Sequence, residues 1–172
     1  PGEYPILLTN QDGTGFQETR FENLIGFWHS ATSGDVDNDG DLDIVLISQG
    51  KTYIMKNNNG VFDIIQDDIN DDSRSIFEYP KESIVPRLSQ VYTSELFDID
   101  SDGFLDLIVS GHDWDGSFGK SYVLFGNGES FLRDIKTLPS GLGYGLSGDI
   151  DFYDIHNDGD IEIILSRTGD PE

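Results

Sequence analysis

The sequence of 172 residues contains no cysteine and few basic residues. Without cysteine there are no disulfide bonds, no cysteine-ligated zinc sites and no thiol nucleophiles. Ten Lys and Arg stand against 33 Asp and Glu, which gives a formal net charge of −23. Because such a chain lacks the basic surface that binds phosphates, we expect neither nucleic acid nor an anionic membrane as a partner. No apolar run is long enough for a membrane span, so membrane insertion is not expected either.

Helical periodicity is also missing, and the apolar residues occur in short runs. They make up 36 % of the chain, with 12 % aromatic residues, which favours a folded core despite the charge. The runs are rich in Ile, Val and Leu, which is typical of strands buried on both faces. The sequence therefore predicts an all-β fold. The large acidic excess indicates either solubility in salt or bound cations.

One acidic segment occurs three times along the chain, and this internal repeat is the strongest signal in the sequence. The copies are GDVDNDGDLDIVLIS, FDIDSDGFLDLIVSG and YDIHNDGDIEIILSR. Their first aspartates, Asp35, Asp98 and Asp154, lie 63 and 56 residues apart. In each copy the acidic part runs directly into an apolar strand, so the segment predicts a loop followed by a buried strand.

The surroundings of this segment repeat as well. A strand of mixed polarity precedes the loop, and a further strand follows it, TYIMK in one copy and SYVLF in another. A Gly/Asn turn and a phenylalanine come next, as in NNNGVF and GNGESF. The repeating unit thus has four strands. We assign residues 1–20 to the outer half of a unit, 26–66 to a unit, 67–90 to an insertion, 91–136 to a unit and 144–168 to the inner half of a unit.

The acidic loop has the residue pattern of a calcium site. Counted from the first aspartate, positions 1, 3 and 5 carry carboxylates and position 6 is a glycine suited to a sharp turn. Position 7 can offer its backbone carbonyl, and the carboxylate at position 9 completes the ligand set. A flexible shell of hard oxygen ligands suits Ca²⁺ better than Mg²⁺. An EF-hand is excluded because its glutamate at position 12 would fall on Leu46, Val109 and Leu165.

The alternative is a simple Asp-Gly hairpin turn with solvated aspartates. Three copies in one frame favour the metal site, because a turn does not require Asp at positions 1, 3 and 9. The third loop departs from the pattern, with His156 at position 3 and Glu162 at position 9. We expect its calcium to be looser, completed by water, or absent, with His156 pointing to solvent.

Loop, buried strand and Asn/Gly–Phe turn together resemble the FG-GAP/VCBS repeats of integrin α-like β-propellers. The resemblance covers nearly the whole chain outside residues 63–88. It implies radially arranged, four-stranded antiparallel blades, each with Ca²⁺ in the hairpin between its first two strands. The metal ligands implied are Asp35, Asp37, Asp39, Asp41 and Asp43 in the first loop, Asp98, Asp100, Asp102, Phe104 and Asp106 in the second, and Asp154, His156, Asp158, Asp160 and Glu162 in the third. Asp41 and Phe104 would contribute backbone carbonyls.

The chain supplies about three blades, whereas propellers have four to eight. Two readings remain open: a fragment of a longer propeller, or an open half-ring completed by a second copy of the chain. Unpaired blade edges would otherwise be prone to aggregation, which favours completion of either kind.

No catalytic constellation is evident, because the three histidines fall in different units and no Gly-rich phosphate loop precedes a helix. We therefore expect no enzyme, but a secreted or cell-surface calcium-binding propeller for adhesion or ligand binding, the ligand being a protein or a glycan. The alternatives are a non-catalytic part of a larger secreted carbohydrate-active enzyme and a purely structural repeat array. Ligand contact is expected at His112, Asp113, Trp114 and Asp115, although Trp114 could instead pack between blades.

Overall fold

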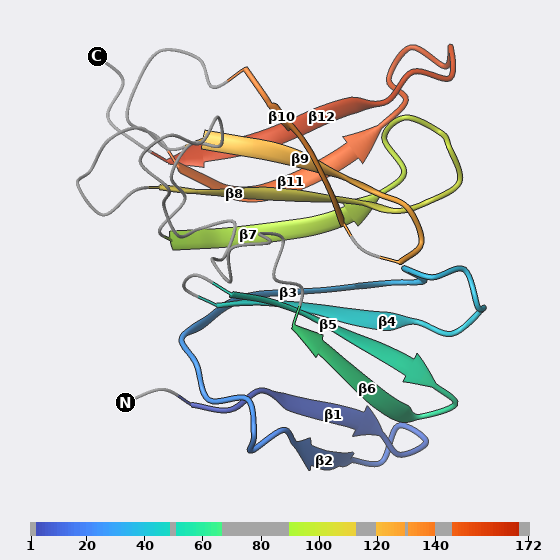
Figure 1. Ribbon diagram of the computed structural model, residues 1–172, viewed down its shortest axis with the longest axis vertical. Coiled ribbons are helices and arrows are strands. Elements are labelled where there is room, and N and C mark those ends of the chain that lie inside the picture. Colours follow the sequence, from blue (N-terminus) through green and yellow to red (C-terminus); the bar gives the residue numbers. More distant parts are fainter. Residues whose placement is uncertain are drawn as a thin grey trace.

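The computed structural model is a stack of antiparallel β-sheets (Figure 1). It describes residues 3–48, 51–66, 90–112, 120–129, 131–139 and 146–168. The strands in these ranges are β1 (Ile6–Asn10), β2 (Phe16–Arg20), β3 (Trp28–Gly34), β4 (Asp43–Ser48), β5 (Lys51–Asn58), β6 (Val61–Gln66), β7 (Gln90–Phe97), β8 (Asp106–His112), β9 (Lys120–Gly126), β10 (Phe131–Thr137), β11 (Leu146–Tyr153) and β12 (Glu162–Thr168).

Two sheets have four strands each, in the orders β3-β4-β5-β6 and β7-β8-β9-β10. We call them the first and second full units. Two hairpins flank them: β1–β2, the N-terminal half unit, and β11–β12, the C-terminal half unit. The prediction of an all-β fold with four-stranded antiparallel units is therefore confirmed. No helix in the described ranges is long and apolar enough to span a membrane.

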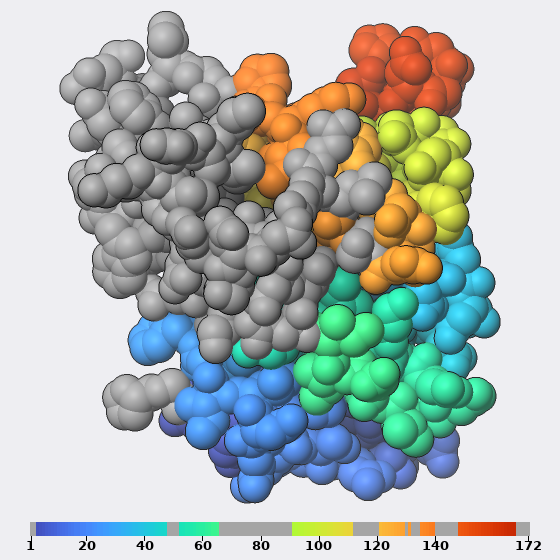
Figure 2. Space-filling view, viewed as in Figure 1, coloured from blue at the N-terminus to red at the C-terminus, as the bar shows by residue number. Residues whose placement is uncertain are grey.

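The four units follow one another in space in the order in which they occur in the sequence (Figure 1). Their first strands lie side by side, with β3 against β7 and β7 against β11. The hairpin loops between first and second strands all emerge at the same edge of the stack, on the right in Figure 1. In Figure 2 the light-blue, yellow-green and red segments there lie one above the other. The fold thus brings the three acidic loops to one edge.

The second strands of the two full units, β4 and β8, are buried on both faces, as their continuous apolar runs predicted, whereas β12 leaves Ile164 48 % exposed. In β4, Val45 and Ile47 pack toward the second full unit, whereas Ile44 and Leu46 pack toward the N-terminal half unit. Strand β8 alternates in the same way between its two neighbouring units. Each four-stranded sheet therefore contributes to two hydrophobic cores, and the packing of successive units holds the stack together.

Every first strand carries a one-residue β-bulge at the same place. The extra residue is His29 in β3, Tyr92 in β7 and Gly148 in β11. The rings of His29 and Tyr92 lie 5.2 Å apart, so the bulges of neighbouring units meet. The repeat is thus preserved down to this local irregularity of the strand pairing.

Candidate metal centre

The three acidic loops connect the first and second strands of their units. They are called the first loop (residues 35–43), the second loop (residues 98–106) and the third loop (residues 154–162), with positions counted 1 to 9 from the first aspartate. All three lie in the described part of the chain at one edge of the stack (Figure 1).

The backbone of each loop makes two left-handed turns. The glycine at position 6 has the positive φ that the sequence predicted: 96° at Gly40, 93° at Gly103 and 93° at Gly159. Position 4 is also left-handed, which sequence reasoning missed: φ is 57° at Asn38, 60° at Ser101 and 56° at Asn157. Asparagine tolerates this region better than most residues, so the two asparagines were the available signal.

The aspartate at position 1 organises the loop backbone. Asp35 accepts hydrogen bonds from the N–H groups of Asp39 and Gly40, both at 3.0 Å. Asp98 and Asp154 accept the equivalent pair of bonds in their own loops. The aspartate at position 1 therefore has a structural role within its own loop, because it satisfies two backbone donors at the tip of the hairpin.

The aspartate at position 9 links three strands. Asp43 is fully buried; its Oδ2 accepts the N–H of Val36 and its Oδ1 that of Asn57, both at 2.8 Å. Val36 follows β3, Asp43 begins β4 and Asn57 lies in β5. One carboxylate thus fixes the loop to the hairpin and to the third strand. The sequence predicted Asp43 only as a metal ligand, because the bond to Asn57 depends on the register of β5.

Asp106 repeats this link in the second full unit. Its two oxygens accept the N–H groups of Ile99 and Gly126, both at 2.9 Å. Burial raises the pKa of the Asp106 carboxyl, the two hydrogen bonds oppose the rise, and the nearby charges of Asp100 and Asp102 add to it. Burial and the neighbouring acidic charges thus disfavour the ionised form of Asp106.

Within the described residues, two groups of three acidic side chains bring one oxygen each within 4.8 Å of the others. They are Asp35, Asp37 and Asp39 in the first loop, and Asp98, Asp100 and Asp106 in the second. In the first loop, Asp37 Oδ2 lies 3.2 Å from the Nζ of Lys56 in β5. Its other oxygen, Oδ1, is buried and has no hydrogen-bond partner among the described residues. A buried carboxylate oxygen beside two further carboxylates is the donor set that fits a hard cation.

The third loop is built differently. Glu162 Oε2 accepts the N–H of Ile155 at 2.8 Å, as position 9 does in the other loops. Its Oε1 lies 2.9 Å from Nδ1 of His156, whose ring is exposed to solvent as expected and also contacts Glu162. The hydrogen bond from the N–H of Ile155 lowers the pKa of the Glu162 carboxyl, and the hydrogen bond with His156 lowers it further by a smaller amount. Among the described residues, the third loop has no group of three acidic or histidine side chains whose ligand atoms all lie within 4.8 Å of one another.

The residue at position 7 contacts the outer turn of its own unit. Asp41 Oδ2 accepts the N–H of Asn59 in the β5–β6 turn at 2.8 Å. In the second full unit the ring of Phe104 lies so close to Gly128 that a Cβ there would be 2.7 Å from it. The side chain at position 7 thus fastens the outer hairpin. The metal-binding carbonyls of Asp41, Phe104 and Asp160 stay a prediction.

The third strand supplies the residues that sequence reasoning missed. Lys56 pairs with Asp37, and Asn57 pairs with Asp43. A signal for Asn57 existed, because aligning the units places Asn57 and Gly126 at the same point before the turn. Nothing in the repeat pointed to Lys56.

The predicted ligand contact falls outside the described residues. Asp113, Trp114 and Asp115 belong to that part, and His112 ends β8 with a side chain that is not described. The predicted insertion, residues 67–90, also lies outside apart from Gln90, which begins β7.

Comparison with known proteins identifies the repeat. A family model described as an FG-GAP-like repeat matches residues 82–165. This range holds the second full unit, the second and third loops and β11. The resemblance drawn from the loop and turn motifs is confirmed for this range. No curated protein matches the chain.

Proposed function

We propose, starting from the FG-GAP-like repeat in residues 82–165, that the chain is a non-catalytic propeller module stabilised by calcium. The observation that carries the proposal is the buried Oδ1 of Asp37, which has no hydrogen-bond partner among the described residues and lies within a group of three aspartates. Burying an anionic oxygen without a partner is costly, and a bound cation removes that cost.

Calcium is the proposed ion because of the donor chemistry of the loops. The first two loops offer several carboxylates and a backbone carbonyl, which suits the six to eight oxygen ligands of Ca²⁺. Mg²⁺ requires a tighter octahedron and gives up its water reluctantly. The third loop has a histidine where the others have an aspartate, so we propose two calcium sites and a third of lower affinity.

The proposed role of the ion is to fasten the hairpin. Asp43 and Asp106 already join the loop to the third strand of their units. The remaining carboxylates repel one another, and a cation turns this repulsion into attraction. Metal binding then contributes directly to the free energy of folding.

The proposed setting is extracellular, in adhesion or ligand binding. Calcium loops of moderate affinity fill at extracellular but not at resting cytosolic concentrations. The ligand would be a protein or a glycan bound by loops other than the acidic ones. Binding of the calcium-loaded chain to a glycan array tests the second possibility, and a variant that combines Trp114→Ala with Asp115→Ala tests the predicted contact.

Thermal unfolding followed by circular dichroism tests the calcium proposal. We expect a higher Tm in Ca²⁺ than in EGTA, with Mg²⁺ giving less, and about two sites by isothermal titration calorimetry. Asp37→Asn removes the unpartnered anionic oxygen with little change in shape, and should abolish one site. Asp63→Asn, on an exposed residue of β6, is the matched control and should leave both sites intact. An equal Tm in EGTA and Ca²⁺ would contradict the proposal.

A further inference from the structure

The two half units are complementary parts of one unit. In the full units, the second strand pairs with a third strand: β4 with β5, and β8 with β9. In the described part of the chain, β12 is a second strand with only β11 beside it, and β1 corresponds to a third strand with only β2 beside it. Each half unit thus presents the sheet edge that the other lacks.

The position of β1 within the repeat can be fixed residue by residue. Asn57 lies opposite Phe62 in the β5–β6 hairpin, and Asn10 lies opposite Phe16 in the β1–β2 hairpin. Both asparagines accept, through Oδ1, the backbone N–H of the glycine three residues later. Asn10 therefore corresponds to Asn57, and the residues before it correspond in register.

Burial at equivalent positions shows that the N-terminal half unit exposes a face that is covered elsewhere. Leu8 corresponds to Met55 and Leu124, which are 0 % and 1 % exposed, yet Leu8 is 56 % exposed. Phe16 corresponds to Phe131, which is 2 % exposed, yet Phe16 is 68 % exposed. These side chains point to where a preceding unit would pack.

The C-terminal half unit exposes the opposite face. Ile164 corresponds to Val45 and Ile108, both 0 % exposed, yet Ile164 is 48 % exposed. Ile155 corresponds to Val36, which is 2 % exposed, yet Ile155 is 52 % exposed. These side chains point to where a following unit would pack.

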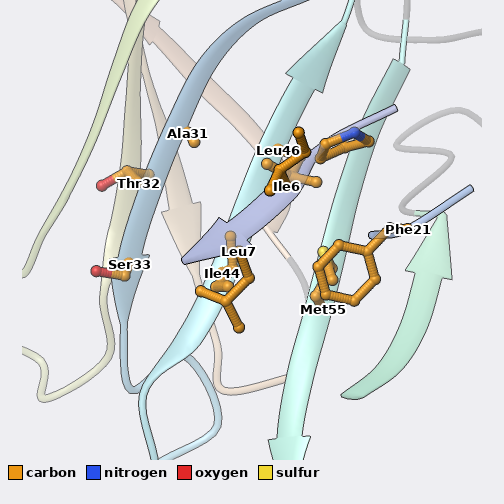
Figure 3. Close-up of a pocket in the computed structure, with 10 residues that line it drawn as sticks. Ile6, Leu7, Phe21, Ala31, Thr32, Ser33, Ile44, Leu46 and Met55 are labelled. Atoms are coloured by element: carbon orange, nitrogen blue, oxygen red, sulfur yellow. The ribbon is translucent and has the colours of Figure 1, made fainter. Parts of the chain in front are cut away.

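A cavity of about 300 Å³ lies beside β1, where a strand next to it would place its side chains (Figure 3). Leu7 of β1 and Ile44 and Leu46 of β4 line it, together with Ala31 of β3. Leu46 and Ile44 also belong to the core between the N-terminal half unit and the first full unit. The cavity is thus the continuation of an interface that already exists between units.

We propose that β12 of one copy of this chain pairs antiparallel with β1 of a second copy. The register of the full units places Ile163 opposite Leu8, and it directs Ile164 of one copy into the cavity of the other. Glu162 would then accept the N–H of Asn10 through the oxygen now beside His156, as Asp43 accepts that of Asn57. The shared unit reads β11-β12-β1-β2, with four antiparallel strands like the full units.

A reciprocal exchange closes the assembly. Each copy gives its C-terminal half unit to the other, so two shared units join four full ones and no open edge remains at β1 or β12. Six units lie within the range of known propellers. The occupant is a second copy because its β11–β12 hairpin carries the matching edge, the matching exposed apolar face and the matching acid at position 9.

Molar mass by light scattering, in calcium and physiological salt to screen the negative charge, tests the proposal. We expect a dimer for the chain and a monomer for Ile164→Arg, with unchanged circular dichroism because Ile164 is already half exposed within one copy. Val61→Arg, on a 72 % exposed residue of β6, is the matched control and should remain dimeric. A monomer for the unaltered chain, or a dimer for Ile164→Arg, overturns the proposal.

The cysteine-free chain permits a second test of the register. The double variant Leu8→Cys/Ile163→Cys should form a disulfide-linked dimer on mild oxidation, because the two residues would be cross-strand neighbours on one face. Leu8→Cys/Ile164→Cys places the thiols on opposite faces and should not. Equal cross-linking of both variants, or none in either, contradicts the proposed pairing.

Discussion

Asn38 of the first loop donates a hydrogen bond from its side-chain amide to the carbonyl oxygen of Gly103 in the second loop, at 3.0 Å. The donor is at position 4 and the acceptor at position 6 of the next loop. Both residues have a positive φ, so the left-handed turns of neighbouring loops meet at this bond. The first and second loops are therefore in direct contact with each other.

The first prediction concerns this bond. Asn38→Gly keeps the positive φ and removes only the amide, whereas Asn157→Gly makes the same backbone change in the third loop, which meets no later loop in the described ranges. Glycine favours this φ in both, so the difference between the two variants isolates the bond. We expect Asn38→Gly to be less stable than Asn157→Gly by about 0.5–1.5 kcal/mol in urea unfolding. Equal stabilities would contradict a stabilising contact between loops.

The second prediction concerns the carboxylate that joins three strands. Asp106→Ala leaves the N–H groups of Ile99 and Gly126 without their acceptor, which should cost about 1–3 kcal/mol for each group that stays buried. Asp106→Asn keeps one acceptor and should lose about half as much. Chemical unfolding in EGTA measures both without a contribution from calcium. An effect below about 0.5 kcal/mol for Asp106→Ala would exclude this structural role.

The third prediction is the pH dependence of the same residue. Burial raises the pKa of Asp106 above its ordinary value of 3.8, so the folded chain holds this proton more tightly than the unfolded chain. In EGTA, the stability of the unaltered chain relative to Asp106→Asn should therefore fall as the pH rises from below 3.8 through the raised pKa. Subtracting the stability of the variant from that of the unaltered chain at each pH cancels the contributions of most other carboxylates. A relative stability that rises with pH over this interval would contradict the predicted direction of the change.

The fourth prediction concerns Gly126, whose N–H is bound by Asp106. A Cβ at this position would lie 2.0 Å from the carbonyl oxygen of Leu105, and backbone cannot move aside cheaply. Gly126→Ala should therefore lose more than about 2 kcal/mol of stability. Gly15→Ala, where a Cβ meets nothing within 4 Å, should change it by less than about 0.5 kcal/mol. Similar losses for both would show that the close approach is not maintained.

The fifth prediction concerns the third loop. His156→Asp combined with Glu162→Asp restores aspartate at positions 3 and 9, as in the other loops. We expect calorimetry to detect one more calcium site than in the unaltered chain, since a fourth carboxylate replaces a ring nitrogen. Tyr153→Phe, just before the loop, controls for unspecific effects. A site count that stays the same would show that the side chains at positions 3 and 9 do not limit binding.

The sequence predicted the strands and the loops well because both follow from local patterns. Alternating burial in β4 follows from its apolar run, and the positive φ of Gly40 from the turn it must make. The link through Lys56 could not be predicted, because it depends on how the third strand lies beside the hairpin, whereas Asn57 could have been found only by aligning the units at the turn. Gly126 illustrates the limit: its equivalent in the first full unit, Asn57, makes the same backbone bond to the aspartate at position 9, and its side-chain amide also donates to the carbonyl of Leu42 at 3.1 Å.

The bulge in β3 reverses the face of the sheet to which the residues before it point. Ser30 pairs with Ile47 and faces the second full unit, where its hydroxyl lies 2.8 Å from that of Ser94. In an unbroken alternation Trp28 would face the same way. Because His29 is accommodated as an extra residue, Trp28 pairs with Ser48 and turns to the core beside the N-terminal half unit. Because of the one added residue, Ser30 of β3 contacts the second full unit while Trp28 of the same strand packs beside the N-terminal half unit.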